Sequence, residues 1–308
     1  MRDAFLRGLT HLARHNDKIM LLTADLGYGV FDEYSRCFPD QYLNVGVAEQ
    51  NMIGIATGLA LEGHIVFAYS IANFSSLRCL EQIRNDASYH EANVNIVASG
   101  GGFSYGALGM SHHATEDLAI LRALPGLTVV APCCPWEAEN ATLALAMTQG
   151  VGYLRLDKTS VDGIDNSGLS FVLGKARRLR EGSDLSIFCT GGIASEGLRL
   201  ADLLETRGMH CRVVSMHTIK PLDRQEILDA VDETRRVITI EEHNLSGGLG
   251  SAIAEVCMDA GIHPLMFHRF GLDDRYSSIV GSQEFLREQY GLDAGTMMRD
   301  VSVLMGFP

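Results

Sequence analysis

The sequence predicts two consecutive α/β sandwich domains with mainly parallel sheets. Short apolar runs rich in Val, Ile and Leu alternate with helical patterns, and this alternation occurs twice along the chain. A polar, glycine-rich stretch separates the two series. With 308 residues, of which 46% are hydrophobic, the chain is long enough for two full cores. These observations predict a first domain at 1–160, a linker at 161–182 and a second domain at 183–308.

The elements of the first domain follow from its apolar patterning. Strands are predicted at 18–26, 64–70, 94–100 and 127–132, and helices at 2–15, 49–62, 75–90, 114–123 and 135–149. The strand segments are continuously apolar rather than alternating, which is typical of strands buried on both faces. Helices placed between such strands predict a parallel sheet that is covered on both sides.

The second domain repeats this pattern after the linker. Strands are predicted at 184–191, 210–217 and 235–243, and helices at 194–208, 223–234 and 250–261. The glycines of the segment 246–250 follow the third strand, but their spacing is not G-x-G-x-x-G. We therefore expect them to let a helix and a strand pack closely, and we disfavour a nucleotide-binding electron-transfer module.

Composition excludes several classes of function. The net charge is −13 and no Lys/Arg-rich block occurs, which argues against nucleic acid or an anionic membrane as a partner. No apolar run reaches the roughly 18 residues of a membrane span, and the N-terminus lacks the apolar core of a signal peptide. The seven cysteines include no C-x-x-C spacing, so neither a metal site nor a redox motif is predicted. Reduced thiols in a cytoplasmic protein are expected.

The most informative residue is Glu49, in the string Asn44–Met52. A turn of small residues precedes this carboxylate, and a long apolar helix pattern follows it. One interpretation is that Glu49 only favours the positive end of the helix. The other is that a poorly solvated carboxylate is kept there to make one charge-assisted hydrogen bond to a ligand.

Four segments, at 44–63, 77–86, 109–132 and 241–256, occur in the same order in the C-terminal half of transketolases and deoxyxylulose phosphate synthases. The chain resembles that family over nearly its whole length. The resemblance implies a thiamine-diphosphate pyrimidine-binding fold followed by a transketolase C-terminal domain. It also implies that Glu49 faces N1′ of the aminopyrimidine, where a carboxyl group supports the imino tautomer that activates the cofactor.

The resemblance implies further cofactor contacts. Asp25 in the string Thr-Ala-Asp-Leu matches a family acid near the cofactor, and it follows a strand whose carboxyl end opens onto the expected crevice. Phe74 is the best match to the aromatic that stacks on the aminopyrimidine, and Tyr69 competes for that role.

Substrate contacts are implied in the same way. In the segment 109–113, His112 matches the family histidine that contacts the oxygens of the donor sugar, and His113 replaces a usual Gln. Arg122 matches an arginine that binds substrate phosphate. Lys158 aligns approximately with a second basic phosphate-binding position, and Arg155 nearby is either part of it or structural.

Departures from the family pattern limit what is implied. Leu108 and Gly100 replace an acid and a histidine of the usual substrate shell, which leaves the ordinary pentose-phosphate pair in doubt. The GDG…N signature of a magnesium-diphosphate site is absent from the sequence. The chain is therefore expected to hold only the pyrimidine half of thiamine diphosphate, while a separate N-terminal-half subunit holds the diphosphate and Mg²⁺.

The resulting prediction is a cytoplasmic subunit of a split transketolase, in a heterotetramer that also self-associates through both of its domains. The enzyme would transfer a two-carbon ketol unit between sugar phosphates, with Glu49 and His112 as its catalytic residues. Two alternatives stay open. One is the β subunit of a 2-oxoacid dehydrogenase decarboxylase component, and the other is a catalytically silent assembly subunit.

Overall fold

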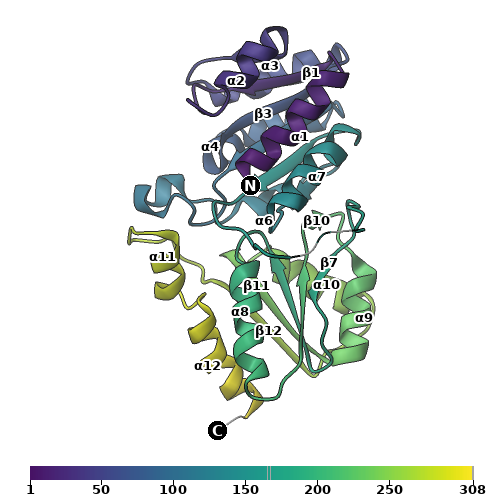
Figure 1. Cartoon of the computed structure of the whole chain (residues 1–308), viewed down its shortest axis with the longest axis vertical. Helices are drawn as coiled ribbons and strands as arrows, with labels where there is room; N and C mark the ends of the chain where they lie inside the picture. Colours follow the sequence, from purple (N-terminus) through teal and green to yellow (C-terminus); the bar gives the residue numbers. More distant parts are fainter. Residues whose placement is uncertain (165, 167, 307–308) are drawn as a thin grey trace.

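The structure, a computed structural model, describes residues 1–164, 166 and 168–306 as two α/β domains stacked along the long axis of the molecule (Figure 1). The N-terminal half forms the upper domain and the C-terminal half the lower one, with α12 at its outer edge (Figure 1). The predicted fold class is confirmed, since most strand pairs in both sheets are parallel.

The first domain is built on a seven-stranded sheet with the order β10-β5-β6-β4-β3-β1-β2. Its strands are β1 Ile19–Thr23, β2 Tyr42–Asn44, β3 Ile65–Ile71, β4 Val94–Ser99, β5 Thr128–Val130, β6 Gly152–Leu156 and β10 Thr218–Lys220. Its helices are α1 Arg2–His15, α2 Asp32–Cys37, α3 Glu49–Leu61, α4 Ala72–Ser76, α5 Leu80–Gln82, α6 Asp117–Ala123 and α7 Pro135–Ala146. Short turns of helix are η1 Pro39–Gln41, η2 Ile83–Ser88, η3 Gly106–Leu108 and η4 Met110–His112.

The second domain is built on a five-stranded sheet with the order β12-β11-β8-β9-β7. Its strands are β7 Arg177–Arg180, β8 Leu185–Thr190, β9 Cys211–Ser215, β11 Arg236–Asn244 and β12 Met266–Leu272. Its helices are α8 Ala194–Glu205, α9 Arg224–Thr234, α10 Leu249–Asp259, α11 Gln283–Gln289 and α12 Ala294–Met305. Strand β7 pairs antiparallel with β9, so an ordered strand lies inside the stretch 161–182 that the sequence indicates as a linker.

The sheets are buried on both faces, which explains the continuous apolar runs. Every residue of β1, β4, β6, β8 and β9 is buried. Helices α1 and α7 pack side by side on one face of the first sheet (Figure 1), and α3 packs on β3.

The two domains share one core. A single cluster of buried apolar side chains extends from Met52 in α3 to Phe188 in β8 and Ile253 in α10. Strand β10 reaches from the second half of the chain into the first sheet, where it pairs antiparallel with β5. The Arg155 side chain is fully buried at this junction and donates a hydrogen bond of 3.0 Å to the carbonyl oxygen of Glu242. These contacts fix the position of the first sheet relative to the second.

None of the helices in the part of the chain that the structure describes is long and apolar enough to cross a bilayer.

Candidate active site

Glu49 is the first residue of α3, and only 4% of its surface is exposed. Its Oε2 accepts a hydrogen bond of 2.7 Å from Nη1 of Arg78. Among the described residues, Arg78 is the one side chain that forms a hydrogen bond or ion pair with this carboxylate. An ion-paired carboxylate accepts further hydrogen bonds, so Oε1 remains available to a ligand that donates one.

Arg78 was not predicted as a site residue. It lies in the turn between α4 and α5, and 44% of its side chain is exposed. Its guanidinium carbon lies 4.2 Å from the centroid of the Phe74 ring, which is a cation–π contact. A buried carboxylate is usually paired with a cation, so the prediction that Glu49 is poorly solvated could have prompted a search for a basic partner. The sequence alone does not show which of the basic residues near 78–84 turns toward the start of α3.

His112 completes the same group of side chains. Its ring meets the Phe74 ring edge-on, with 5.0 Å between the centroids. Its Nδ1 lies 3.0 Å from the Ser111 hydroxyl, and the Asn73 amide donates to the carbonyl oxygen of Ser111. Glu49, Arg78, Phe74 and His112 therefore form one continuous series of contacts that begins at α3 and ends at η4.

Asp25 follows β1 at the carboxyl edge of the first sheet. It has a left-handed φ of +56°, and its Oδ1 accepts hydrogen bonds from the Tyr28 hydroxyl at 2.5 Å and from Nδ2 of Asn44 at 3.1 Å. These two bonds, the Tyr28 bond first, lower the pKa of the Asp25 carboxyl. Strands β1 and β2 are neighbours, so Asp25 and the segment that leads into Glu49 lie at the same edge of the sheet.

Tyr69 and His113 are buried against other aromatic side chains. Tyr69 is buried among Phe5 and Phe31, with its ring edge-on to Phe31 at 4.8 Å. His113 is buried with its ring edge-on to Phe103, and burial lowers the pKa of its imidazole. Of the two aromatic candidates, only Phe74 contacts Arg78 and His112 in the described part of the chain.

Arg122 has other partners. Its Nε donates a hydrogen bond of 2.6 Å to the carbonyl oxygen of Gly247, and its Nη2 pairs with Glu255 of α10. Only 19% of the Arg122 side chain is exposed. Two N–H groups of the guanidinium therefore bind the second domain, and the phosphate contact stays a prediction.

Lys158 lies at the end of β6, with its ammonium 4.0 Å from the centroid of the Tyr105 ring. Partial burial lowers the pKa of its amine. It lines a pocket of about 330 Å³ together with Arg2, Ser99 and Asp157.

Gly100 and Leu108, the two departures from the family pattern, lie in different surroundings. Gly100 has a φ of +86°, and a Cβ atom there would overlap the Tyr105 ring, so a larger residue does not fit. Leu108 is exposed at the end of η3.

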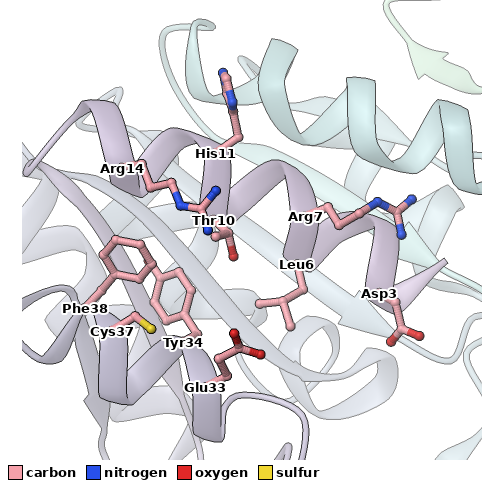
Figure 2. Close-up of a pocket in the computed structure, with 10 residues that line it drawn as sticks. All are labelled: Asp3, Leu6, Arg7, Thr10, His11, Arg14, Glu33, Tyr34, Cys37 and Phe38. Carbon is pink, nitrogen blue, oxygen red and sulfur yellow. The ribbon is translucent and has the colours of Figure 1, made fainter.

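A pocket of about 500 Å³ lies elsewhere, between α1 and α2. Figure 2 shows Leu6 and Thr10 of α1 facing Tyr34 and Phe38 at α2. None of the predicted site residues lines it. Pocket size alone therefore does not locate the candidate site.

Comparison with protein families gives two matches that together span most of the chain. The family described as "Transketolase, pyrimidine binding domain" matches residues 1–162, and "Transketolase, C-terminal domain" matches residues 174–297.

Two curated relatives are similar over almost their whole length. The chain is 35% identical to a subunit of the apulose-4-phosphate transketolase of Phocaeicola vulgatus, over 95% of this chain and 93% of that protein. It is 36% identical to a subunit of the 6-deoxy-6-sulfo-D-fructose transketolase of a Clostridium species, over 97% of this chain and 92% of that protein.

Two solved transketolase structures are also similar to this chain. A split-gene transketolase, described as an inactive β4 tetramer, superposes with a TM-score of 0.89 at 35% identity, covering 98% of this chain and 96% of that one. The transketolase of Campylobacter jejuni has the same fold, with a TM-score of 0.80 at 19% identity, and this chain covers 46% of it.

Proposed function

This chain belongs to the transketolase family, and we propose that it is the pyrimidine-binding subunit of a two-subunit, thiamine-diphosphate-dependent transketolase. The observation that carries the proposal is the series of contacts from Glu49 through Arg78 and Phe74 to His112. It combines a buried carboxylate, a flat aromatic ring and an imidazole at one edge of the sheet.

The donor set fits the aminopyrimidine of thiamine diphosphate. Glu49 has one carboxylate oxygen bonded to Arg78, which leaves the second to accept a hydrogen bond from N1′. The half-buried Phe74 offers a ring on which a flat heterocycle stacks, a contact of about 0.5–1.5 kcal/mol beyond burial. Glu49 and Phe74 would hold the aminopyrimidine, and the cofactor would supply carbanion chemistry to the reaction.

The residues of this chain would position charge around that chemistry. Glu49 would hold the N1′ proton, and Arg78 would keep the carboxylate aimed at it. His112 would donate a hydrogen bond to the oxygen that becomes negative at C2 of the donor, a contribution of the oxyanion-hole type. Asp25, with its two hydrogen bonds to Tyr28 and Asn44, would stiffen the loop beside Glu49.

The proposed reaction is reversible transfer of a two-carbon ketol unit from a ketose to an aldose. The two relatives named above act, by their names, on apulose 4-phosphate and on 6-deoxy-6-sulfo-D-fructose. Both substrates carry a strong anion. Of the basic residues predicted to bind phosphate, Lys158 places its ammonium over the Tyr105 ring and forms no ion pair with any described residue, whereas the guanidinium of Arg122 is held by the second domain. We therefore assign the anionic end of the substrate to Lys158 rather than to Arg122.

We further propose a cytoplasmic partner subunit that binds the diphosphate through Mg²⁺ and closes the site. The similarity to subunits of split transketolases supports such a partner, as does the description of the β4 tetramer as inactive. Two copies of each subunit would form a heterotetramer. The relatives favour this function over a 2-oxoacid dehydrogenase β subunit or a silent assembly subunit.

The test is reconstitution. The chain is mixed with a candidate N-terminal-half subunit, thiamine diphosphate and Mg²⁺, and assayed against a panel of ketose donors with phosphorylated, sulfonated and unmodified aldose acceptors. Ketol transfer by the mixture, absent with either subunit alone, supports the proposal. Oxidative decarboxylation of a 2-oxoacid to a lipoyl domain would instead identify the first alternative.

A further inference from the structure

A pair of adjacent cysteines, Cys133 and Cys134, lies between β5 and α7 at the junction of the two domains, outside the proposed active site. Both are buried. Their Sγ atoms and a carboxylate oxygen of the buried Glu137 all lie within 4.8 Å of one another. The two sulfur atoms are thus neighbours, and rotation of the side chains and of the intervening peptide would bring them to bonding distance.

The surroundings of Cys134 favour a thiolate. Cys134 is the N-cap of α7, a helix of 12 residues, so it lies at the positive end of the helix dipole. Nη1 of Arg177 donates to its Sγ at 3.4 Å. The thiol of Cys133 also donates to it, which is the largest cause of a Cys134 pKa lowered to about 7. The same hydrogen bond, followed by burial, raises the pKa of Cys133 well above its ordinary value, so it keeps its proton.

The arrangement suits oxidation better than a metal ion. Oε2 of Glu137 already accepts hydrogen bonds from the Cys133 amide at 2.8 Å and from the Ser215 hydroxyl at 3.1 Å. Oε1 of Glu137 is paired with Arg177 at 3.4 Å, and the same Nη1 contacts Cys134. A guanidinium therefore occupies the position from which a metal cation would bind both groups, and it repels such a cation.

A pocket lies next to the pair, on the side of Arg177. This pocket of about 330 Å³ is lined by Trp136, Phe171, His217 and Arg177. Arg177 both lines this pocket and contacts the Cys134 sulfur, and its guanidinium carbon lies 5.0 Å from the Trp136 ring. A small oxidant in this pocket would be one side chain away from Cys134, and displacement of Arg177 would admit it.

We propose that Cys133 and Cys134 form a peroxide-sensitive dithiol that closes to a vicinal disulfide. The Cys134 thiolate attacks one oxygen of a hydroperoxide such as hydrogen peroxide, the O–O bond breaks, and the released hydroxide takes a proton to become water. Cys133 then attacks the sulfenic sulfur of Cys134, and its proton leaves with the hydroxyl group as a second water. In total, two thiols and one hydrogen peroxide give one disulfide and two waters.

Closure would act on the domain junction. The carbonyl oxygen of Cys133 accepts a hydrogen bond of 2.8 Å from the amide of Val161, and Cys134 begins α7. Arg177 belongs to β7 of the second sheet. Joining the two sulfur atoms turns the intervening peptide and removes the thiolate from Arg177. The contact between α7 and β7 would therefore change with oxidation state.

The experiment treats the reduced full-length chain with increasing hydrogen peroxide at several pH values, blocks free thiols by alkylation and analyses peptides by mass spectrometry. The expected peptide containing both cysteines is lighter by two hydrogen atoms, carries no alkyl group and regains two alkylation sites after dithiothreitol. The rate should increase as the pH rises through about 7, where the Cys134 thiolate forms. The exposed Cys37 serves as the internal reference for peroxide exposure.

Two variants sharpen the test. Cys133→Ser should leave Cys134 as a sulfenic acid that dimedone traps, with no disulfide, whereas Cys257→Ser, which changes a buried thiol elsewhere, should behave as wild type. The wild-type measurement decides the proposal even if Cys133→Ser does not fold. Full alkylation of both thiols after Cys37 is consumed would overturn it, as would addition of oxygens without closure. Retention of one zinc ion per chain by the pair would also overturn it, in favour of a metal site.

Discussion

Glu49→Gln is the sharpest test of the proposed site, because the structure separates its effect on activity from its effect on stability. Gln keeps the shape of the side chain and loses the negative charge. The broken ion pair involves an Arg78 side chain that is 44% exposed, so it should cost only about 0.2–1 kcal/mol. Loss of a first-turn acid adds about 0.3–1 kcal/mol. We expect Tm to fall by only a few degrees.

The expected effect on activity is far larger. Acid–base contributions of this kind are worth about 10²–10⁴-fold, or roughly 3–5.5 kcal/mol, because Gln cannot hold the N1′ proton. The assay is ketol transfer by the reconstituted two-subunit enzyme, with thermal unfolding of the same preparations. The matched control is Glu62→Gln, at the exposed C-cap of the same helix, which should leave turnover unchanged.

Two results would refute this reasoning. A Glu49→Gln enzyme that keeps half or more of the wild-type kcat would make Glu49 an ordinary acid at a helix end. A large loss of Tm would make it a structural residue whose loss of activity follows from unfolding.

Three further predictions concern assembly and packing. The isolated chain should bind thiamine diphosphate weakly and catalyse no ketol transfer. Calorimetry that shows micromolar affinity of the isolated chain for thiamine diphosphate, together with turnover by that chain, would contradict the two-subunit proposal. Arg122→Ala should remove the contact with Gly247 and Glu255 and lower stability by about 1–2 kcal/mol, while KM for phosphorylated sugars stays within about twofold of wild type. A KM raised about tenfold only for phosphorylated substrates would return Arg122 to the phosphate site. Gly197→Ala places a Cβ against the Cys189 sulfur, closer than two such atoms can pack. Although alanine normally favours a helix, this substitution should therefore lower the stability of the protein by about 1–3 kcal/mol. An unchanged or raised Tm in thermal unfolding would contradict this prediction.

Most of the central strands were predictable because each is a continuous apolar run of local sequence. Strands β2, β6, β7, β10 and β12 were missed. Arg155 interrupts the apolar run of β6, His268 and Arg269 interrupt that of β12, and the other three strands are short. β2 and β10 have three residues each and β7 has four, and β7 and β10 exist because a distant strand pairs with them. Short segments of this kind carry too little periodicity to be recognised before their partners are known.

Candidate site residues could be predicted where a short sequence motif contains them. They were harder to predict where their contacts depend on residues far away in the sequence. Glu49 and His112 stand in recognisable strings, and their catalytic roles stay predictions. Arg122 looks free in sequence because its partner Glu255 is 133 residues away. Phe74 was the better match by sequence and Tyr69 competed with it. The structure places Tyr69 within β3, where it packs on Phe5 of α1, and Phe74 beyond the end of that strand.

Strand β10 crosses the boundary between the two family domains. By sequence it belongs to the second, and by hydrogen bonding it completes the first sheet beside β5. A fragment cut between the two family matches would therefore expose the backbone N–H and C=O groups of β5 as an open edge that invites another chain to pair with it. Fragments of this protein should aggregate where the whole chain does not. Chimaeras that exchange one half between relatives should carry the segment 218–220 along with the first half.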